Sequence, residues 1–300
     1  MRTPGSREDG VTNSGEAFAI EDRAGVLAGP VRRPTNASKT AVGSIHDDAT
    51  AQRLGFRGGT VAGNIHFEQF PPLLEAALGA DWARTGSLSL YFLTPTTDGE
   101  PVQAFAHLQP DGRAKVWMDD AHGQKVCEGT ASVGAPDARS ALRERLLTVR
   151  PAEDLRVLAG ISVGDSVDDV SARVDSARGA SRLAVITEDL ARYHDPAAFG
   201  ARVAPPATAI DALRAVEIPL FAKVQGFVGM FGAIELQMLD GPIFTDHDYL
   251  ARGRVLALSE SPKTEIVWYE SILHDAADGR DVARMILMSR LLKASSPLWA

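Results

Sequence analysis

The chain has 300 residues, about twice the length of a typical domain, so two domains or one large fused unit are expected. Hydrophobic residues make up 45% and charged residues 23%, which argues against a disordered, collagen-like or coiled-coil chain. The formal net charge of -8 argues against nucleic acid as the main partner, because nucleic-acid binding needs a positive surface. The single cysteine, Cys127, excludes an intrachain disulfide and a cysteine-based zinc site within the chain.

Residues 1–16 are polar and rich in Gly, Ser and Thr, so we expect a flexible tail without the apolar core of a signal peptide. No run approaches the roughly eighteen apolar residues of a membrane-spanning helix, so no membrane partner is expected. A cytoplasmic location is the default expectation.

The first half of the chain predicts a helix followed by an antiparallel meander. Residues 59–82 place apolar side chains at helical spacing, interrupted by Pro71 and Pro72. The connections at 109–112 and 119–123 are short and rich in turn residues, as hairpins require. Four strand-like runs lie at residues 88–93, 102–108, 114–118 and 125–133.

The second half repeats this order after a linker at residues 136–153, which is rich in Ala, Arg and Asp and contains a short helical pattern. Pro205 and Pro206 open a helix-like stretch to about residue 224, which Pro219 kinks or ends. Strand-like runs follow at residues 233–239, 249–258, 264–273 and 281–287.

An internal echo supports a duplicated unit. Residues 116–133 and 267–289 share a Val-Trp strand, an acidic turn with Gly and a second Val-containing strand. Because strands arrive in runs and do not alternate with helices, the pattern predicts an α+β fold. The two expected units are residues 17–135 and 154–300.

A more specific signal lies in residues 44–64, SIHDDATAQRLGFRGGTVAGN. This segment resembles the signature region of the MaoC-like dehydratases, the (R)-specific enoyl-CoA hydratase 2 family, which have the hotdog fold. The matching positions are Ile45-His46, Asp48, Gly55-Phe56, Gly58-Gly59 and Val61-Ala62. The resemblance implies two fused hotdog units, each a central helix wrapped by an antiparallel sheet, and it covers residues 40–135 well and 155–292 loosely.

The chain also departs from the family pattern. By the family's spacing, the catalytic Asp should fall at Ala41, the Asn at Gly43 and the Pro at Ser44, so none of the three is present. Adding water to an enoyl thioester needs a base, an acid and donors that stabilise the enolate oxygen. The resemblance implies that His46 transfers the proton and that a backbone N–H near Gly63 or Asn64 supplies the donor.

Other residues could complete this site, and each also has a structural interpretation. His66 lies just inside the central helix, where it is either a site residue or a core histidine. Asp48 either orients His46 or favours the dipole of a helix that begins there. The pair His194-Asp195 either supplies the missing acid from the second unit or forms an exposed turn.

Three further side chains remain open candidates. Glu68 and Glu235 could replace the lost carboxylate, and Arg57 could hold a CoA phosphate through a bidentate contact. No motif for a metal or a dinucleotide cofactor is present, so neither is expected.

The sequence therefore predicts a MaoC-like hydratase or dehydratase that acts on an acyl-CoA or acyl-carrier thioester, with His46 as its proton-transfer group. Two alternatives remain: a non-catalytic acyl-thioester binding protein or subunit, because Ala41 replaces the expected carboxylate, and a thioesterase on the same scaffold. Association of two chains as a homodimer is compatible with each of these.

Overall fold

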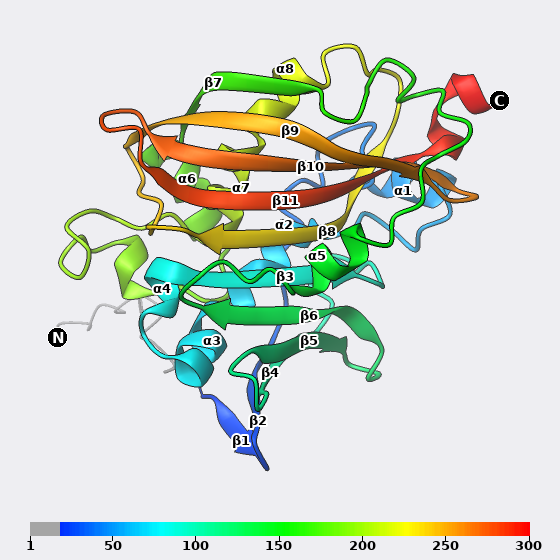
Figure 1. Cartoon of the computed structure of the whole chain (residues 1–300). Helices are drawn as coiled ribbons and strands as arrows, with labels where there is room; N and C mark the ends of the chain where they lie inside the picture. The colour runs from blue at the N-terminus through cyan, green and yellow to red at the C-terminus, as the bar shows by residue number, and fades with distance from the viewer. Residues whose placement is uncertain (1–18) are drawn as a thin grey trace, which may run out of the picture.

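The computed structural model describes residues 19–300, so the predicted tail at residues 1–16 lies outside the described part (Figure 1). No helix within residues 19–300 is long and apolar enough to cross a membrane.

The first unit contains six strands and several short helices. Its strands are β1 (Glu21–Arg23), β2 (Val26–Arg32), β3 (Gly86–Phe92), β4 (Val102–Leu108), β5 (Ala114–Asp120) and β6 (Lys125–Val133). Its helices are α1 (Asp48–Arg53), α2 (Gly63–His66), the 3-10 turn η1 (Phe67–Gln69), α3 (Pro71–Leu78) and α4 (Trp82–Thr85).

The second unit follows the linker helix α5 (Ala141–Leu146). Its strands are β7 (Ser166–Arg173), β8 (Gly229–Met238), β9 (Asp248–Glu260), β10 (Thr264–Asp275) and β11 (Asp281–Leu292). Its helices and 3-10 turns are α6 (Ser176–Leu183), η2 (Ala191–Tyr193), α7 (Pro206–Leu213), η3 (Arg214–Val216), α8 (Glu217–Leu220), η4 (Lys293–Ser295) and η5 (Pro297–Trp299).

All the strands belong to one 11-stranded sheet in the order β1-β2-β4-β5-β6-β3-β8-β11-β10-β9-β7. The order β2-β4-β5-β6-β3 of the first unit reappears reversed in the second unit as β8-β11-β10-β9-β7. The units join where β3 pairs antiparallel with β8, with Leu88 opposite Leu236 and Leu90 opposite Ile234. The predicted α+β layout with a duplicated unit is therefore confirmed.

The predicted central helix of the first unit is broken into α2, η1 and α3. Pro71, at the start of α3, has no N–H to donate to the preceding turn, so a regular helix cannot continue across it. Phe67, Phe70 and Leu74 remain buried against the sheet on both sides of this break. Helix α2 contacts α7 of the second unit, so the two central helices lie side by side on one face of the sheet (Figure 1).

The linker helix α5 packs on the opposite face of the sheet. Its Leu142 is buried in a cluster with Trp268 and Ile286, whereas their neighbours Val267 and Leu287 belong to the main core. Successive residues of a strand point to opposite faces, so the two clusters lie on the two sides of the sheet. Glu235 of β8 fixes α5 in place, because it accepts hydrogen bonds from Ser140 and Arg143.

Strands β1, β2 and β7 were not predicted, because their pairing is irregular or short. The register of β2 shifts between Ala28 and Val31, and that of β7 shifts between Val167 and Val170. In β7 the backbone of Asp169 has a φ of 53°, outside the strand region. Such bulges interrupt the two-residue alternation by which a strand is recognised in a sequence.

Candidate functional site

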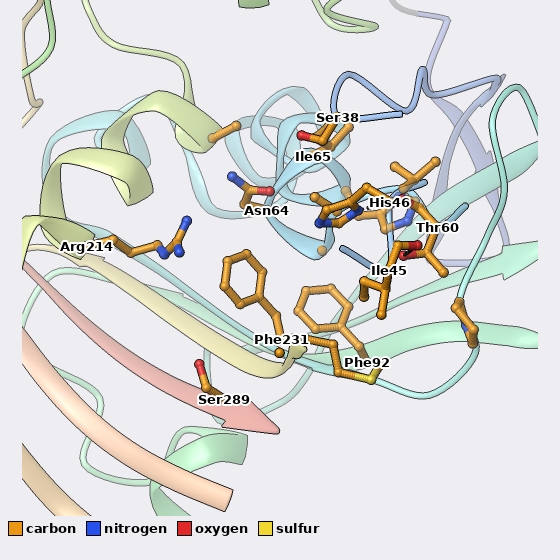
Figure 2. Close-up of a pocket in the computed structure, with 18 of the residues that line it drawn as sticks. Ser38, Ile45, His46, Thr60, Asn64, Ile65, Phe92, Arg214, Phe231 and Ser289 are labelled. Carbon is orange, nitrogen blue, oxygen red and sulfur yellow. Dashed lines mark hydrogen bonds between the residues drawn. The ribbon is translucent and has the colours of Figure 1, made fainter. Parts of the chain in front are cut away.

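A cavity of about 620 Å³ lies between the two units and is lined by residues from both central helices (Figure 2). This volume is within the range of about 300–1,000 Å³ that small-molecule sites occupy. The first unit contributes His46, Asn64 and Phe92, and the second contributes Arg214 and Phe231. The cavity is thus apolar over much of its surface, with a few polar groups placed along it.

The ring of His46 is held in one orientation and one neutral tautomer. Its Nδ1 lies 2.8 Å from the carbonyl oxygen of Thr60. A carbonyl only accepts hydrogen bonds, so Nδ1 carries the hydrogen and Nε2 of the neutral ring keeps its lone pair. The backbone is fixed as well, because Asn36 Nδ2 donates to the carbonyl oxygen of His46 at 2.8 Å. The arrangement leaves Nε2 of a half-buried, cavity-lining ring as a proton acceptor.

The loop that carries His46 is closed by a backbone contact that only glycine allows. A Cβ on Gly59 would lie 2.2 Å from the carbonyl oxygen of His46, far inside van der Waals contact. The N–H of Gly59 donates to Asp48 Oδ1 at 2.7 Å. Asp47 caps α1 by accepting from the N–H of Thr50 at 3.0 Å. Asp48 does not line the cavity, so its carboxylate bears on the site by fixing this loop.

Gly63 and Asn64 open α2 at the wall of the cavity. Neither backbone N–H has a hydrogen-bond acceptor among residues 19–300, as is usual for the first turn of a helix. A Cβ on Gly63 would lie 2.7 Å from the ring of Phe92, so glycine lets the wall of the cavity close at this point. The side-chain Oδ1 of Asn64 is buried without a partner in the described chain.

His66 also lines the cavity, but it is buried and neutral. Burial lowers its pKa from the usual 6.5 to about 4, and the charge of Glu100 opposes that shift. Its Nε2 lies 3.0 Å from Thr96 Oγ1, and its Nδ1 has no partner among the described residues.

The low pKa of His66 predicts a pH-dependent stability. Between about pH 6.5 and pH 4 the unfolded chain binds a proton that the folded chain does not, so stability is lost as the pH falls. His66→Gln should remove this loss. When the pH falls from 7.5 to 5, the unfolding free energy of wild type should decrease by about 2 kcal/mol more than that of the variant. Urea unfolding at the two pH values measures it, and parallel changes would show that His66 titrates normally.

The carboxylate that the family pattern places beside the histidine has no substitute in contact with His46. No carboxylate oxygen in residues 19–300 lies within 4.0 Å of a His46 ring nitrogen. Ala41 is exposed. Glu68 is buried in an ion pair with Arg182, and Glu235 is held on the other face of the sheet. His46 is therefore without a carboxylate partner in the described chain.

The structure does not bring His194, Asp195 or Arg57 to this cavity. The ring of His194 is exposed and its Nε2 lies 2.5 Å from Asp189 Oδ1, while Asp195 accepts from the N–H of Ala197 at 2.9 Å. Both thus belong to a surface turn. Arg57 is exposed and pairs with Glu100 at 3.0 Å.

Sequence reasoning missed the charged wall that the second unit supplies. Asp211, Arg214 and Glu217 line the cavity at three-residue spacing, which was the available signal. Arg214 Nη2 donates to Glu217 Oε2 at 2.7 Å, and the hydroxyl of Tyr269 donates to Glu217 Oε1 at 2.6 Å. Arg214 thus compensates the charge of Glu217, which suits a structural wall of an otherwise apolar cavity.

The described residues contain no set of side chains that could bind a metal ion. No group of three or more His, Cys, Asp or Glu side chains within 19–300 could hold a metal ion. The lone Cys127 is buried.

Comparison with known proteins identifies the fold through structure alone. No protein-family model and no curated protein sequence matches the chain. RV0216, a conserved hypothetical protein from Mycobacterium tuberculosis with a double hotdog fold, is 13% identical with a TM-score of 0.59, over 87% of this chain and 93% of that one. A putative MaoC domain protein dehydratase from Chloroflexus aurantiacus is 15% identical with a TM-score of 0.59, over 94% of this chain and 99% of that one.

A third similar structure contains a bound acyl thioester. It is the dehydratase domain of PpsC from Mycobacterium tuberculosis in complex with C12:1-CoA, 12% identical with a TM-score of 0.52, over 92% of this chain and 97% of that one. These matches extend over nearly the whole chain, through both units and the sheet that joins them. The chain therefore has the double hotdog fold that MaoC-like dehydratases have.

Proposed function

We propose that the protein is a hydratase or dehydratase of the MaoC-like type, which adds water to a 2-enoyl thioester or removes it from a 3-hydroxyacyl thioester. The single observation that carries this proposal is the His46 ring, whose Nδ1–H is fixed on the Thr60 carbonyl so that Nε2 is left as a base in the cavity. Imidazole is the side chain that most often acts as a general base in enzymes.

The chemistry follows from the groups along the cavity. His46 Nε2 takes a proton from water as the water oxygen bonds to Cβ, and the electrons of the double bond move toward the thioester. The N–H groups of Gly63 and Asn64 are free to stabilise the negative charge that develops on the thioester oxygen. The imidazolium then returns the proton to Cα, so that one group serves as base and acid in the absence of a neighbouring carboxylate.

The acyl thioester is supported as the substrate class by the cavity and by the structural neighbours. The apolar walls that include Phe92, Phe221 and Phe231 suit an acyl chain. The dehydratase domain of PpsC, which shares the fold, binds C12:1-CoA. CoA and an acyl-carrier protein both present such a thioester, and both remain candidates for the carrier.

Incubation of the pure protein with crotonyl-CoA and longer 2-enoyl-CoAs tests the proposal directly. We expect the absorbance of the conjugated enoyl thioester to fall as water adds, with no release of free CoA. Release of free CoA would instead show a thioesterase.

A non-catalytic acyl-thioester binder is the second candidate, and one observation favours it. Within residues 19–300 His46 has no carboxylate partner, and the position where the family pattern places the Asp is the exposed Ala41. Saturable binding of enoyl-CoA with no change in absorbance at any chain length would establish this candidate in place of the enzyme.

A further inference from the structure

One buried cation of the second unit lines the cavity, and one of its hydrogen-bond donors has no acceptor among the described residues. Arg182 of α6 lines the cavity and is 9% exposed. Its Nε donates to Glu68 Oε1 at 2.8 Å, and its Nη2 also donates to Glu68, which is 0% exposed. Its Nη1 is buried but has no acceptor among residues 19–300. A buried donor without an acceptor is costly, so the structure favours a ligand that supplies one.

Two other polar atoms along the same cavity also lack a partner in the part of the chain that the structure describes. They are Oδ1 of Asn64 and Nδ1 of His66, and both side chains are more than nine-tenths buried. A ligand with a purely alkyl chain leaves all such groups unsatisfied. A hydroxyl or keto oxygen can accept from Arg182 Nη1, and a hydroxyl can also donate to Asn64 Oδ1, which only accepts. A site built to hydrogen-bond an oxygen discriminates strongly against analogues that lack it. The cavity is therefore better matched to an acyl chain that carries oxygen.

The charges around the cavity indicate which kind of oxygen fits. Among the described residues, Arg182 is paired with Glu68 and Arg214 with Glu217, so each of these two cations already has a carboxylate partner. Burial raises the pKa of Glu68 to about 7, against the hydrogen bond from Arg182. A second carboxylate beside Arg182 would have to be buried next to Glu68, whereas a hydroxyl or keto oxygen needs only a donor.

We propose that the site selects acyl thioesters whose chain carries a neutral oxygen function beyond Cβ, a hydroxyl or keto group that accepts a hydrogen bond from Arg182 Nη1. This inference rests on the proposed function, because it assigns the substrate class of the same cavity. Glu68 holds the guanidinium by two of its nitrogens, which leaves the third for the ligand.

The test compares kcat/KM for hydration of 2-enoyl-CoAs of one chain length. The set contains the plain chain and analogues with a hydroxyl, keto or carboxyl group at successive positions from Cγ to the chain end. We expect at least one hydroxyl or keto analogue to exceed the plain chain by about tenfold or more. Equal values throughout, or a preference for the carboxyl analogue, would overturn the inference.

Variants then assign the selectivity to Arg182. Arg182→Leu combined with Glu68→Leu removes both charges together, so that neither is left buried alone. We expect the ratio between the preferred analogue and the plain chain to fall to about one. The matched control is Arg143→Leu with Glu235→Leu, which removes a comparable ion pair (2.9 Å) on the other face of the sheet, and it should keep the ratio. A ratio that survives in the first double variant contradicts the role of Arg182.

Two further measurements keep the test decisive. Arg182→Lys keeps a cation beside Glu68 but removes the guanidinium fork, so it should lower the ratio even if the double variant does not fold. Calorimetric titration with saturated acyl-CoAs, with and without the hydroxyl or keto group, tests recognition apart from catalysis. If no enoyl-CoA is hydrated, the proposed function fails, but tighter binding of the oxygenated chain would still support recognition of its oxygen by Arg182. Equal binding of the two chains would contradict that recognition.

Discussion

Replacing His46 by Ala should lower kcat/KM for hydration of 2-enoyl-CoA by at least about a hundredfold, the usual worth of a general base. Among the described residues the ring makes one hydrogen bond, from Nδ1 to the Thr60 carbonyl, and the backbone of its loop is held separately by Asn36. We therefore expect the variant to fold. Steady-state rates from the loss of enoyl absorbance measure the effect, and circular dichroism checks the fold.

His122→Ala is the matched control. This histidine is exposed in the turn between β5 and β6, away from the cavity, so its replacement should leave kcat/KM within error of wild type. Wild-type rates in the folded His46→Ala variant would remove His46 from the mechanism.

Gly59→Ala should damage the site without touching any side chain that lines it. The added Cβ would lie 2.2 Å from the carbonyl oxygen of His46 and 3.2 Å from Asn36 Nδ2. Backbone atoms cannot move aside cheaply, so the His46 loop must shift and lose the hydrogen bond that Asn36 donates to it. We expect kcat/KM to fall by about tenfold or more and the free energy of unfolding to drop by about 1–3 kcal/mol.

The control for this substitution is Gly160→Ala. A Cβ there would meet Lys223 at 3.5 Å, an ordinary contact, so activity should be retained. Unchanged rates in Gly59→Ala would mean that the close approach of residue 59 to the His46 loop does not position the ring.

The duplicated fold could be predicted from the sequence because its signals are local. The strands β4 and β6 have the predicted bounds, since Val102–Leu108 and Lys125–Val133 are regular runs between clear turns. Strands β2 and β7 were missed, because irregularities between Ala28 and Val31 and at Asp169 interrupt the alternation. The broken central helix follows from Pro71, although its separate pieces depend on tertiary packing.

Some residues of the candidate site could also be predicted from the sequence, and others could not. His46, Gly63, Asn64 and His66 lie within one short segment, so a local pattern was enough to find them, and the structure gathers all four at one cavity. Arg182 could not be found, because its partner Glu68 is 114 residues away in the chain and only packing of the two units brings them together. His194 and Asp195 were singled out by residue type and by their place upstream of the second central helix, and neither says which surface carries them.

The most direct test of the central claim is a crystal structure of the protein with a 3-hydroxyacyl-CoA, the product of hydration. We predict that the 3-hydroxyl lies within hydrogen-bond distance of His46 Nε2 and that the thioester oxygen accepts from the N–H of Gly63 or Asn64. An acyl group bound elsewhere, or one that enters this cavity with its hydroxyl out of reach of His46, would contradict the account.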